Sequence, residues 1–149
     1  MKEHQNLFRD LQEDFRKMKK NLLVAQSGGP TAAINATLAG VIKQAIKEEQ
    51  IDQVYGACYG IQGVLEQKFV NLTEKVDTEE KLEKLKRTPA AALGSCRFKL
   101  NDIKEDDSQY QEIVDILHKM NIGYFVYIGG NDSMDTVAKL SAYCKEKGV

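Results

Sequence analysis

The sequence has few of the residues that build metal clusters or disulfide scaffolds. Its 149 residues include three cysteines, two histidines and no tryptophan. Cys58, Cys96 and Cys144 are odd in number, widely spaced and form no CxxC pair, so they give no zinc-ligand pattern. Reduced thiols of this kind are typical of cytoplasmic proteins, and we expect a cytoplasmic location.

An excess of one charge and long apolar runs are also lacking. With 21 basic and 22 acidic side chains the net charge is −1, so no overall positive field attracts nucleic acid. Any bound anion must therefore be held by local groups. No apolar run approaches the about 18–20 residues needed to cross a membrane. We expect neither nucleic acid nor a membrane as a partner, and the first residues lack the apolar core of a signal peptide.

Residues 1–20 have the periodicity of one amphipathic helix. Apolar side chains recur at helical spacing between charged and amide side chains: Leu7, Phe8, Leu11, Phe15 and Met18. The pattern of apolar and charged residues changes abruptly after this segment. We predict a helical extension at 1–20 and a separate domain at 21–149. The helix could pack on that domain, pack on a partner or be loosely attached, and the sequence favours none of these.

Strands and helices alternate from residue 21 onward. Strands are predicted at four short apolar runs: 22–25, 51–58, 68–72 and 124–128. Helices are predicted at 34–46, at the charged run 74–87, after the acidic loop 102–107 as far as 120, and at 134–147. Residues 88–93 are predicted as a turn and a possible strand. The alternation favours an α/β fold with a doubly wound, mainly parallel sheet.

Two glycine turns each follow a predicted strand and lead into a helix. Gly28 and Gly29 follow the first strand, and Gly129 and Gly130 follow the last. Ligands of open α/β sheets lie outside the carboxyl ends of the strands, where backbone N–H groups and positive helix ends face the same crevice. Neither turn is a P-loop or a GxGxxG motif. Each alone could be a plain connection; together they predict a site for one polyphosphate or two phosphorylated ligands. Arg97 could clamp a phosphate there or be a surface arginine.

Four segments, in order, resemble motifs of the phosphofructokinase family. Residues 27–35 (SGGPTAAIN) resemble its first phosphate-binding turn, and 56–63 (GACYGIQG) match its GxxxGxxG pattern. Residues 88–98 (TPAAALGSCRF) resemble its LGS-x-R-[FY] segment, and 129–133 (GGNDS) its GGDGS turn. The resemblance covers residues 21 to 149. It implies a Rossmann-like, donor-binding N-terminal domain of a kinase that transfers phosphate in glycolysis.

The resemblance implies a role for each motif residue. Gly28 and Gly29 of the first turn, with Gly130, Asp132 and Ser133 of the second, would form the binding site for the phosphates of the donor. Arg97 would contact the transferring phosphate and stabilise negative charge in the transition state.

The same resemblance implies Mg²⁺ as cofactor, beside Asn131 and Asp132. The family often has Asp where this chain has Asn131, and a neutral amide is a poorer magnesium ligand than a carboxylate. Assignment of the metal ligands to these two residues therefore stays open, and water or carboxylates outside this chain could hold the ion instead.

Asp132 stands where ATP-dependent members have glycine. A carboxylate there adds bulk and negative charge where the α-phosphate of ATP would pass, and the pyrophosphate-using branch is similar in carrying Asp. The resemblance thus implies pyrophosphate as donor and fructose 6-phosphate as acceptor. The alternatives are an ATP-dependent 6-phosphofructokinase and a non-catalytic phosphate-binding module completed by another chain.

The family continues with a segment of the type P-[GK]-T-I-D-N-D, whose first Asp is the general base, and with a second domain. This sequence stops at Val149 without either. We expect an N-terminal fragment that lacks the general base and is inactive alone, and a homo-oligomer when complete.

Overall fold

One four-stranded sheet organises the domain. The computed structural model describes residues 2–29 and 31–149. Within these ranges the strands lie in the order β3-β2-β1-β4. Their bounds are Lys20–Gln26 for β1, Ile51–Ala57 for β2, Phe69–Asn71 for β3 and Ile122–Ile128 for β4. β1 pairs in parallel with β2 and β4, and β3 pairs antiparallel with β2. The predicted α/β fold with a mainly parallel sheet is confirmed.

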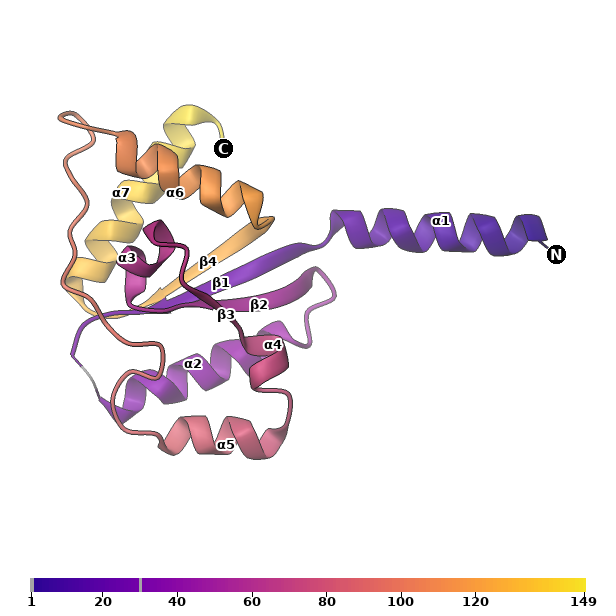
Figure 1. Cartoon of the computed structure of the whole chain (residues 1–149), viewed down its shortest axis with the longest axis horizontal. Helices are drawn as coiled ribbons and strands as arrows, with labels where there is room; N and C mark the ends of the chain where they lie inside the picture. The colour runs from indigo at the N-terminus through magenta and orange to yellow at the C-terminus, as the bar shows by residue number, and fades with distance from the viewer. Residues whose placement is uncertain (1, 30) are drawn as a thin grey trace.

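Helices cover both faces of this sheet (Figure 1). α2 (Ala32–Ala45), α4 (Leu72–Lys75) and α5 (Glu79–Arg87) lie on one side. α3 (Gly60–Leu65), α6 (Ser108–Lys119) and α7 (Asn131–Lys147) lie on the other. Because successive side chains of a strand point to opposite faces, the continuous apolar run of β1 serves both cores. Leu22 and Val24 pack with α2, whereas Leu23 and Ala25 pack on the side of α3, α6 and α7.

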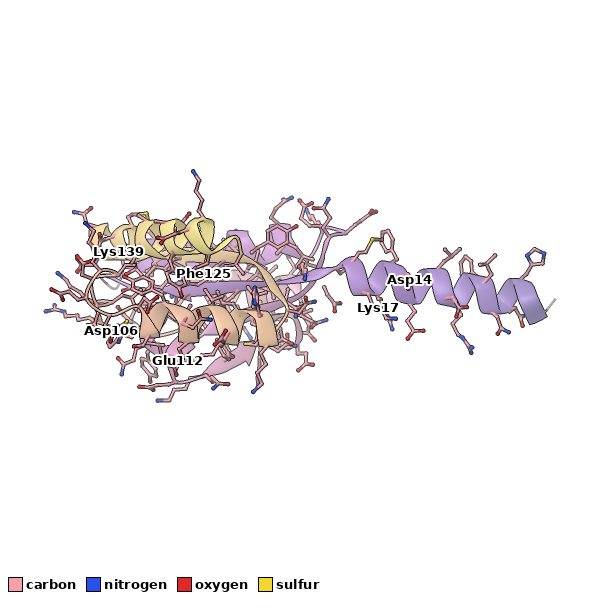
Figure 2. The ribbon with its side chains drawn as sticks, turned by 90° about the horizontal axis from the view of Figure 1, so that it is seen from above. Asp14, Lys17, Asp106, Glu112, Phe125 and Lys139 are labelled. Atoms are coloured by element: carbon pink, nitrogen blue, oxygen red, sulfur yellow. The ribbon has the colours of Figure 1, made fainter. Side chains whose placement is uncertain are left out.

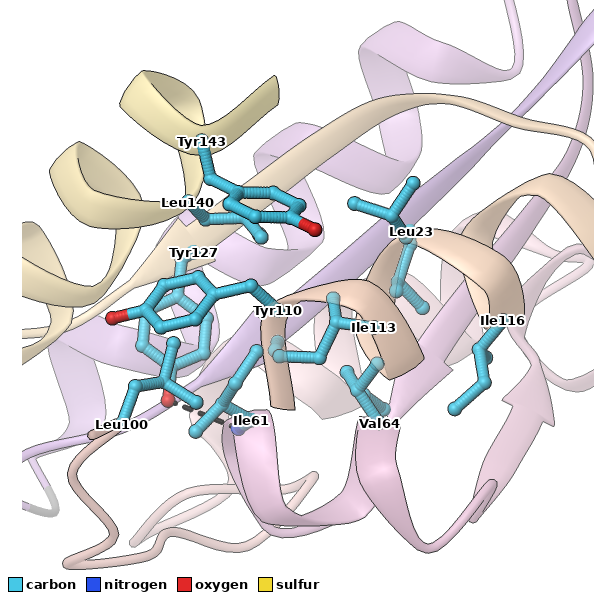
Figure 3. Packing of buried hydrophobic residues seen from close by; sticks show 13 residues of the cluster. Leu23, Ile61, Val64, Leu100, Tyr110, Ile113, Ile116, Tyr127, Leu140 and Tyr143 are labelled. Carbon is cyan, nitrogen blue, oxygen red and sulfur yellow. Dashed lines mark hydrogen bonds between the residues drawn. The ribbon is translucent and has the colours of Figure 1, made fainter. Parts of the chain in front are cut away.

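The larger core contains two fully buried tyrosines (Figure 3). The rings of Tyr110 on α6 and Tyr143 on α7 are tilted against each other, with 5.5 Å between their centroids. Each hydroxyl donates a hydrogen bond, Tyr110 to the Asn101 carbonyl at 2.8 Å and Tyr143 to Gln111 Oε1 at 2.9 Å. Buried tyrosine is stable only when its hydroxyl finds such a partner. These contacts join α6 and α7 and support β4 from one side.

Two local predictions differ from the structure. The charged run 74–87 forms parts of two short helices, because Asn71 Oδ1 and Thr78 Oγ1 each accept a bond from a backbone N–H and start a new helix. Residues 88–93, a possible strand by sequence, form neither helix nor strand. Their backbone groups are bonded by buried side chains instead of by a neighbouring strand.

The first helix, α1 (Lys2–Met18), projects away from the domain (Figures 1 and 2). In Figure 2, Asp14 and Lys17 mark the end of this helix that lies nearer the domain. Its apolar stripe is between 53% and 70% exposed: Leu7, Phe8, Leu11, Phe15 and Met18. The structure has a helix in the predicted segment, ending at Met18, and its stripe belongs to neither core of the described residues. Neither α1 nor another helix in the described ranges is long and apolar enough to cross a membrane.

Candidate phosphate-binding site

The two glycine turns meet at the carboxyl ends of β1 and β4. Ser27 donates its N–H to the Ile128 carbonyl at 2.8 Å. Gly28 has a φ of +90°, and a Cβ placed on it would lie 3.2 Å from the backbone nitrogen of Gly130. Glycine suits this position because the left-handed region is strained for other residues and the turns approach closely. Both turns therefore share one edge of the sheet, as the sequence predicted.

A pocket of about 790 Å³ opens beside the two turns. It brings together every site residue expected from the sequence: Gly28, Gly29, Arg97, Gly130, Asn131, Asp132 and Ser133. Its wall also includes Lys99 and Tyr127, which the sequence analysis did not single out. The structure thus assembles one concave site from three segments that are far apart in the chain.

The segment 95–99 is tied to the first turn by two hydrogen bonds. Ser95 Oγ donates to the Gly28 carbonyl and Ser27 Oγ donates to the Cys96 carbonyl, both at 3.1 Å. These bonds place Arg97 on the pocket wall. Its side chain is exposed and forms no ion pair with the residues that the structure describes. An exposed guanidinium on a backbone held in this way is available for bidentate binding of an anion.

Buried amide side chains support the same segment from behind. Asn35 Nδ2 donates to the Thr88 carbonyl at 2.7 Å, and its Oδ1 accepts from the Ala92 N–H at 2.9 Å. Gln26 Oε1 accepts from the Leu93 N–H at 2.9 Å. Both amides are fully buried, where unpaired backbone groups would be costly. The asparagine six residues after the glycine turn therefore builds the pocket wall and does not line the pocket.

The glycines of residues 56–63 also shape the wall. A Cβ on Gly56 would lie 2.8 Å from Leu93 Cδ2, and one on Gly60 would lie 2.7 Å from the Tyr127 hydroxyl. At Gly63 it would meet a backbone carbonyl oxygen only 1.6 Å away. Gly56 and Gly60 let Leu93, Cys96 and Tyr127 pack closely around the end of β2, and Gly63 lets the turn after β2 close against the backbone of Cys58. All three glycines are therefore required by packing.

Tyr127 lies between this packing region and the pocket. Its hydroxyl accepts a bond from the Ile61 N–H at 3.1 Å (Figure 3). Burial raises the pKa of Tyr127, so the ring presents a neutral hydroxyl. It stabilises the start of α3 and adds no charge to the site.

The second glycine turn leads into α7, and the first turn of this helix contains an unpartnered hydroxyl. Ser133 is 2% exposed, and its Oγ has no hydrogen-bond partner among the described residues. A buried polar atom left unpaired costs about 1–3 kcal/mol. Ser133 lies in the first turn of a 17-residue helix, where free backbone N–H groups and the helix dipole favour an anion. An oxygen of a bound phosphate would supply the acceptor that Ser133 lacks.

Three charged side chains line the pocket. Arg97 and Lys99 are positive and Asp132 is negative. Lys99 Nζ lies 3.8 Å from Asp132 Oδ1, and these two side chains are 77% and 78% exposed. The pocket therefore carries one net positive charge although the chain as a whole is slightly negative. Such a local field attracts anions to the site.

The donor set for a metal ion is small. No group of three or more His, Cys, Asp or Glu side chains that could hold a metal ion occurs in residues 2–29 and 31–149. Mg²⁺ in phosphate sites usually keeps several waters and is bound by one or two carboxylates plus the phosphates. Asp132 and the amide of Asn131 fit an ion that arrives with a phosphate ligand, and they do not form a metal cage of their own.

The comparisons with known proteins agree with this fold and site. A family model for phosphofructokinase matches residues 21–148. The chain belongs to the phosphofructokinase family, as its motifs indicated.

Several similar relatives are named for pyrophosphate as the phosphoryl donor, and others are named for ATP. The chain is 44% identical over 123 residues to a pyrophosphate–fructose 6-phosphate 1-phosphotransferase of Rhodospirillum rubrum, covering 83% of this chain and 29% of that protein. It is 40% identical over 129 residues to the protein of that name from Halomonas elongata, covering 86% and 30%. A pyrophosphate-dependent phosphofructokinase structure from Nitrosospira multiformis superposes with a TM-score of 0.79 at 37% identity, covering 87% and 31%. The chain spans about three-tenths of the length of these relatives.

Proposed function

We propose that this chain forms the donor-binding part of a pyrophosphate–fructose 6-phosphate 1-phosphotransferase. The whole protein would move a phosphoryl group from pyrophosphate to the 1-hydroxyl of fructose 6-phosphate, a step of glycolysis. The observation that carries the proposal is the single pocket joining both glycine turns, Arg97 and Asp132. The relatives named for this reaction support it. A cytoplasmic location and a homo-oligomeric state of the whole protein stay predictions.

Three kinds of group in the pocket could bind phosphate: backbone N–H groups, a hydroxyl and a guanidinium. The backbone N–H groups around Gly28, Gly29 and Gly130 would bind phosphate oxygens at a helix N-terminus. The buried Ser133 hydroxyl would donate a further bond, and Arg97 would stabilise the charge of the transferring phosphate. Because phosphoryl transfer needs mostly positioning and charge neutralisation, these groups are suited to the donor half of the reaction.

Mg²⁺ is the proposed cofactor. Asp132, with the amide of Asn131, would hold it beside the donor phosphates, directly or through water. When bound, the ion would neutralise charge that develops on the phosphate oxygens. Arg97 would neutralise the same charge from the protein side, without the ion.

Asp132 is the proposed donor filter. Its carboxylate is exposed at the pocket, where it would repel a further phosphate of a nucleotide and occupy the space that this phosphate needs. Pyrophosphate has no such extension. The side chain would therefore disfavour ATP, the donor of the rival proposal, without obstructing the smaller donor.

The experiment is a calorimetric titration of the 149-residue chain with pyrophosphate and with ATP, each with Mg²⁺ in excess. We expect pyrophosphate to bind at least about tenfold tighter, a difference of about 1.4 kcal/mol. Asp132→Gly should reduce that ratio. Asp135→Gly is the matched control, since Asp135 lies on the same helix and pairs with Lys139 outside the pocket. Equal binding of both donors by the unchanged chain would contradict the proposal.

A further inference from the structure

Side chains alternate between exposed and core-packed along residues 97–100. Phe98 is half-buried, packs on the larger core and also borders the pocket, and Leu100 is buried in that core. Arg97, which precedes Phe98, and Lys99, which follows it, are exposed and line the pocket. Alternation of this kind arises where successive side chains of an extended segment point to opposite sides. Because Phe98 and Leu100 pack on the core, the side chains of both Arg97 and Lys99 lie at the pocket.

The surroundings of Lys99 differ from those of an ordinary surface lysine. Its ammonium faces Asp132, the acidic side chain of the pocket, at 3.8 Å. Both groups are mostly exposed, and an exposed pair at this distance is weak and screened by salt. A bound phosphate would offer Lys99 a more highly charged partner in the same pocket. Lys99 can therefore exchange Asp132 for the phosphate without a change in the fold.

We propose that Lys99 is a second phosphate-binding cation of the donor site and that Asp132 keeps its ammonium at the pocket until the donor binds. This inference rests on the proposed function, since it concerns the same donor. Arg97 has a planar fork that suits two oxygens of one phosphoryl group, whereas Lys99 has a compact charge with rotatable donors. Lys99 therefore suits the second phosphoryl group of pyrophosphate, whose orientation varies more.

Asp132 would have one role before the donor binds and another after Lys99 leaves its carboxylate for the phosphate. Before binding, the weak attraction of its carboxylate favours positions of the Lys99 ammonium near the pocket and so slightly lowers the cost of ordering this long, flexible side chain. After binding, Lys99 turns to the phosphate and the carboxylate becomes free for a cation bound to the same ligand. The pocket then has two positive side chains against the phosphates, and its affinity should fall with salt more steeply than a site with one.

The test is the dissociation constant of pyrophosphate, measured by calorimetry with Mg²⁺ at two salt concentrations. The proteins are the unchanged chain, Lys99→Gln, Lys99→Arg and the control Lys104→Gln. Lys104 is an exposed lysine outside the pocket, so its replacement makes the same change in net charge. We expect Lys99→Gln to weaken binding about tenfold and to reduce the salt dependence, because a charged hydrogen bond is lost. Lys99→Arg should retain most of the affinity, and Lys104→Gln should match the unchanged chain.

The outcomes separate this inference from the proposed function. If the unchanged chain binds pyrophosphate tightly and the dissociation constant of Lys99→Gln differs from it by less than twofold, the role of Lys99 is overturned and the proposed donor site stands. An equal loss in Lys99→Gln and Lys104→Gln reflects net charge alone and also overturns it. No pyrophosphate binding by the unchanged chain overturns both proposals. Thermal midpoints of all four proteins should agree, because both lysines are exposed and neither lies in a core.

Discussion

Five glycines of the family motifs fall into two groups that differ in what surrounds them. At Gly56, Gly60 and Gly63 a Cβ would lie 2.8 Å or less from other atoms of the protein. At Gly29 and Gly130 it would meet nothing within 4 Å in the described part of the chain. The first group is required by close packing, at the pocket wall for Gly56 and Gly60 and within the turn after β2 for Gly63. The second group lines the open pocket, and its contact with a ligand is a prediction.

Of the changes considered, Gly63→Ala should cause the largest loss in the free energy of unfolding. The new methyl group would lie 1.6 Å from the Cys58 carbonyl oxygen, a backbone atom that cannot move without displacing the end of β2. We expect a loss of about 3 kcal/mol or more in the free energy of unfolding, measured by urea denaturation. A loss below about 1 kcal/mol would place Gly63 with the second group and break the comparison.

Asn35→Ala should give the next largest loss of stability, because it removes interactions and not because it adds a group that does not fit. It removes the hydrogen bonds that the buried Asn35 side chain forms with the backbone of residues 88–92, and it adds no steric conflict. We expect a loss of about 2–4 kcal/mol in the free energy of unfolding. Thr37→Ala on the same helix is the control, because Thr37 is exposed. Equal stabilities of the two variants would show that the wall does not depend on Asn35.

Gly130→Ala should separate binding from stability. Gly130 precedes the first residue of α7 with a φ of −93°, which alanine can adopt, so we expect less than about 1 kcal/mol of destabilisation. The methyl group would enter the pocket and weaken pyrophosphate binding, by calorimetry, about tenfold. Gly40→Ala is the matched control, since its Cβ also meets nothing and lies outside the pocket. If both variants bind as the unchanged chain does, the second turn does not contact the donor.

Deletion of residues 1–17 should give the smallest effect of all. The stripe of α1 is exposed, so its removal exposes no core and leaves both glycine groups as they are. We expect the free energy of unfolding of the remainder to change by less than about 1 kcal/mol, because little apolar area is uncovered. A loss of several kcal/mol would show that Leu7, Leu11 and Phe15 pack on the domain in solution.

Elements with strong periodicity were predictable from the sequence. The runs at 22–25 and 124–128 lie within β1 and β4, and the structure extends both strands toward their N-termini. Lys20 and Ile122 belong to these strands through pairing with neighbours, which an apolar pattern does not encode. The meeting of the two glycine turns was also predictable, because parallel neighbouring strands end at the same edge.

The wall of the pocket was less predictable because residues 88–99 have no helical or strand pairing. Their path depends on Gln26 and Asn35, whose partners are more than 50 residues away in the chain. The approach of Lys99 to Asp132 depends on the same path. A sequence signal for Lys99 existed in its spacing of two from Arg97, with Phe98 between them. The catalytic and binding roles of the site residues stay predictions.

The most direct test of a shared phosphate site is amide chemical-shift mapping of the ¹⁵N-labelled chain with Mg²⁺ and increasing pyrophosphate. Binding at the two turns predicts that the largest shifts occur together at Gly28, Gly29, Gly130 and Ser133, with one common dissociation constant. Shifts that spread over the exposed lysines of α5, or that appear at one turn only, would contradict a single site formed by both turns.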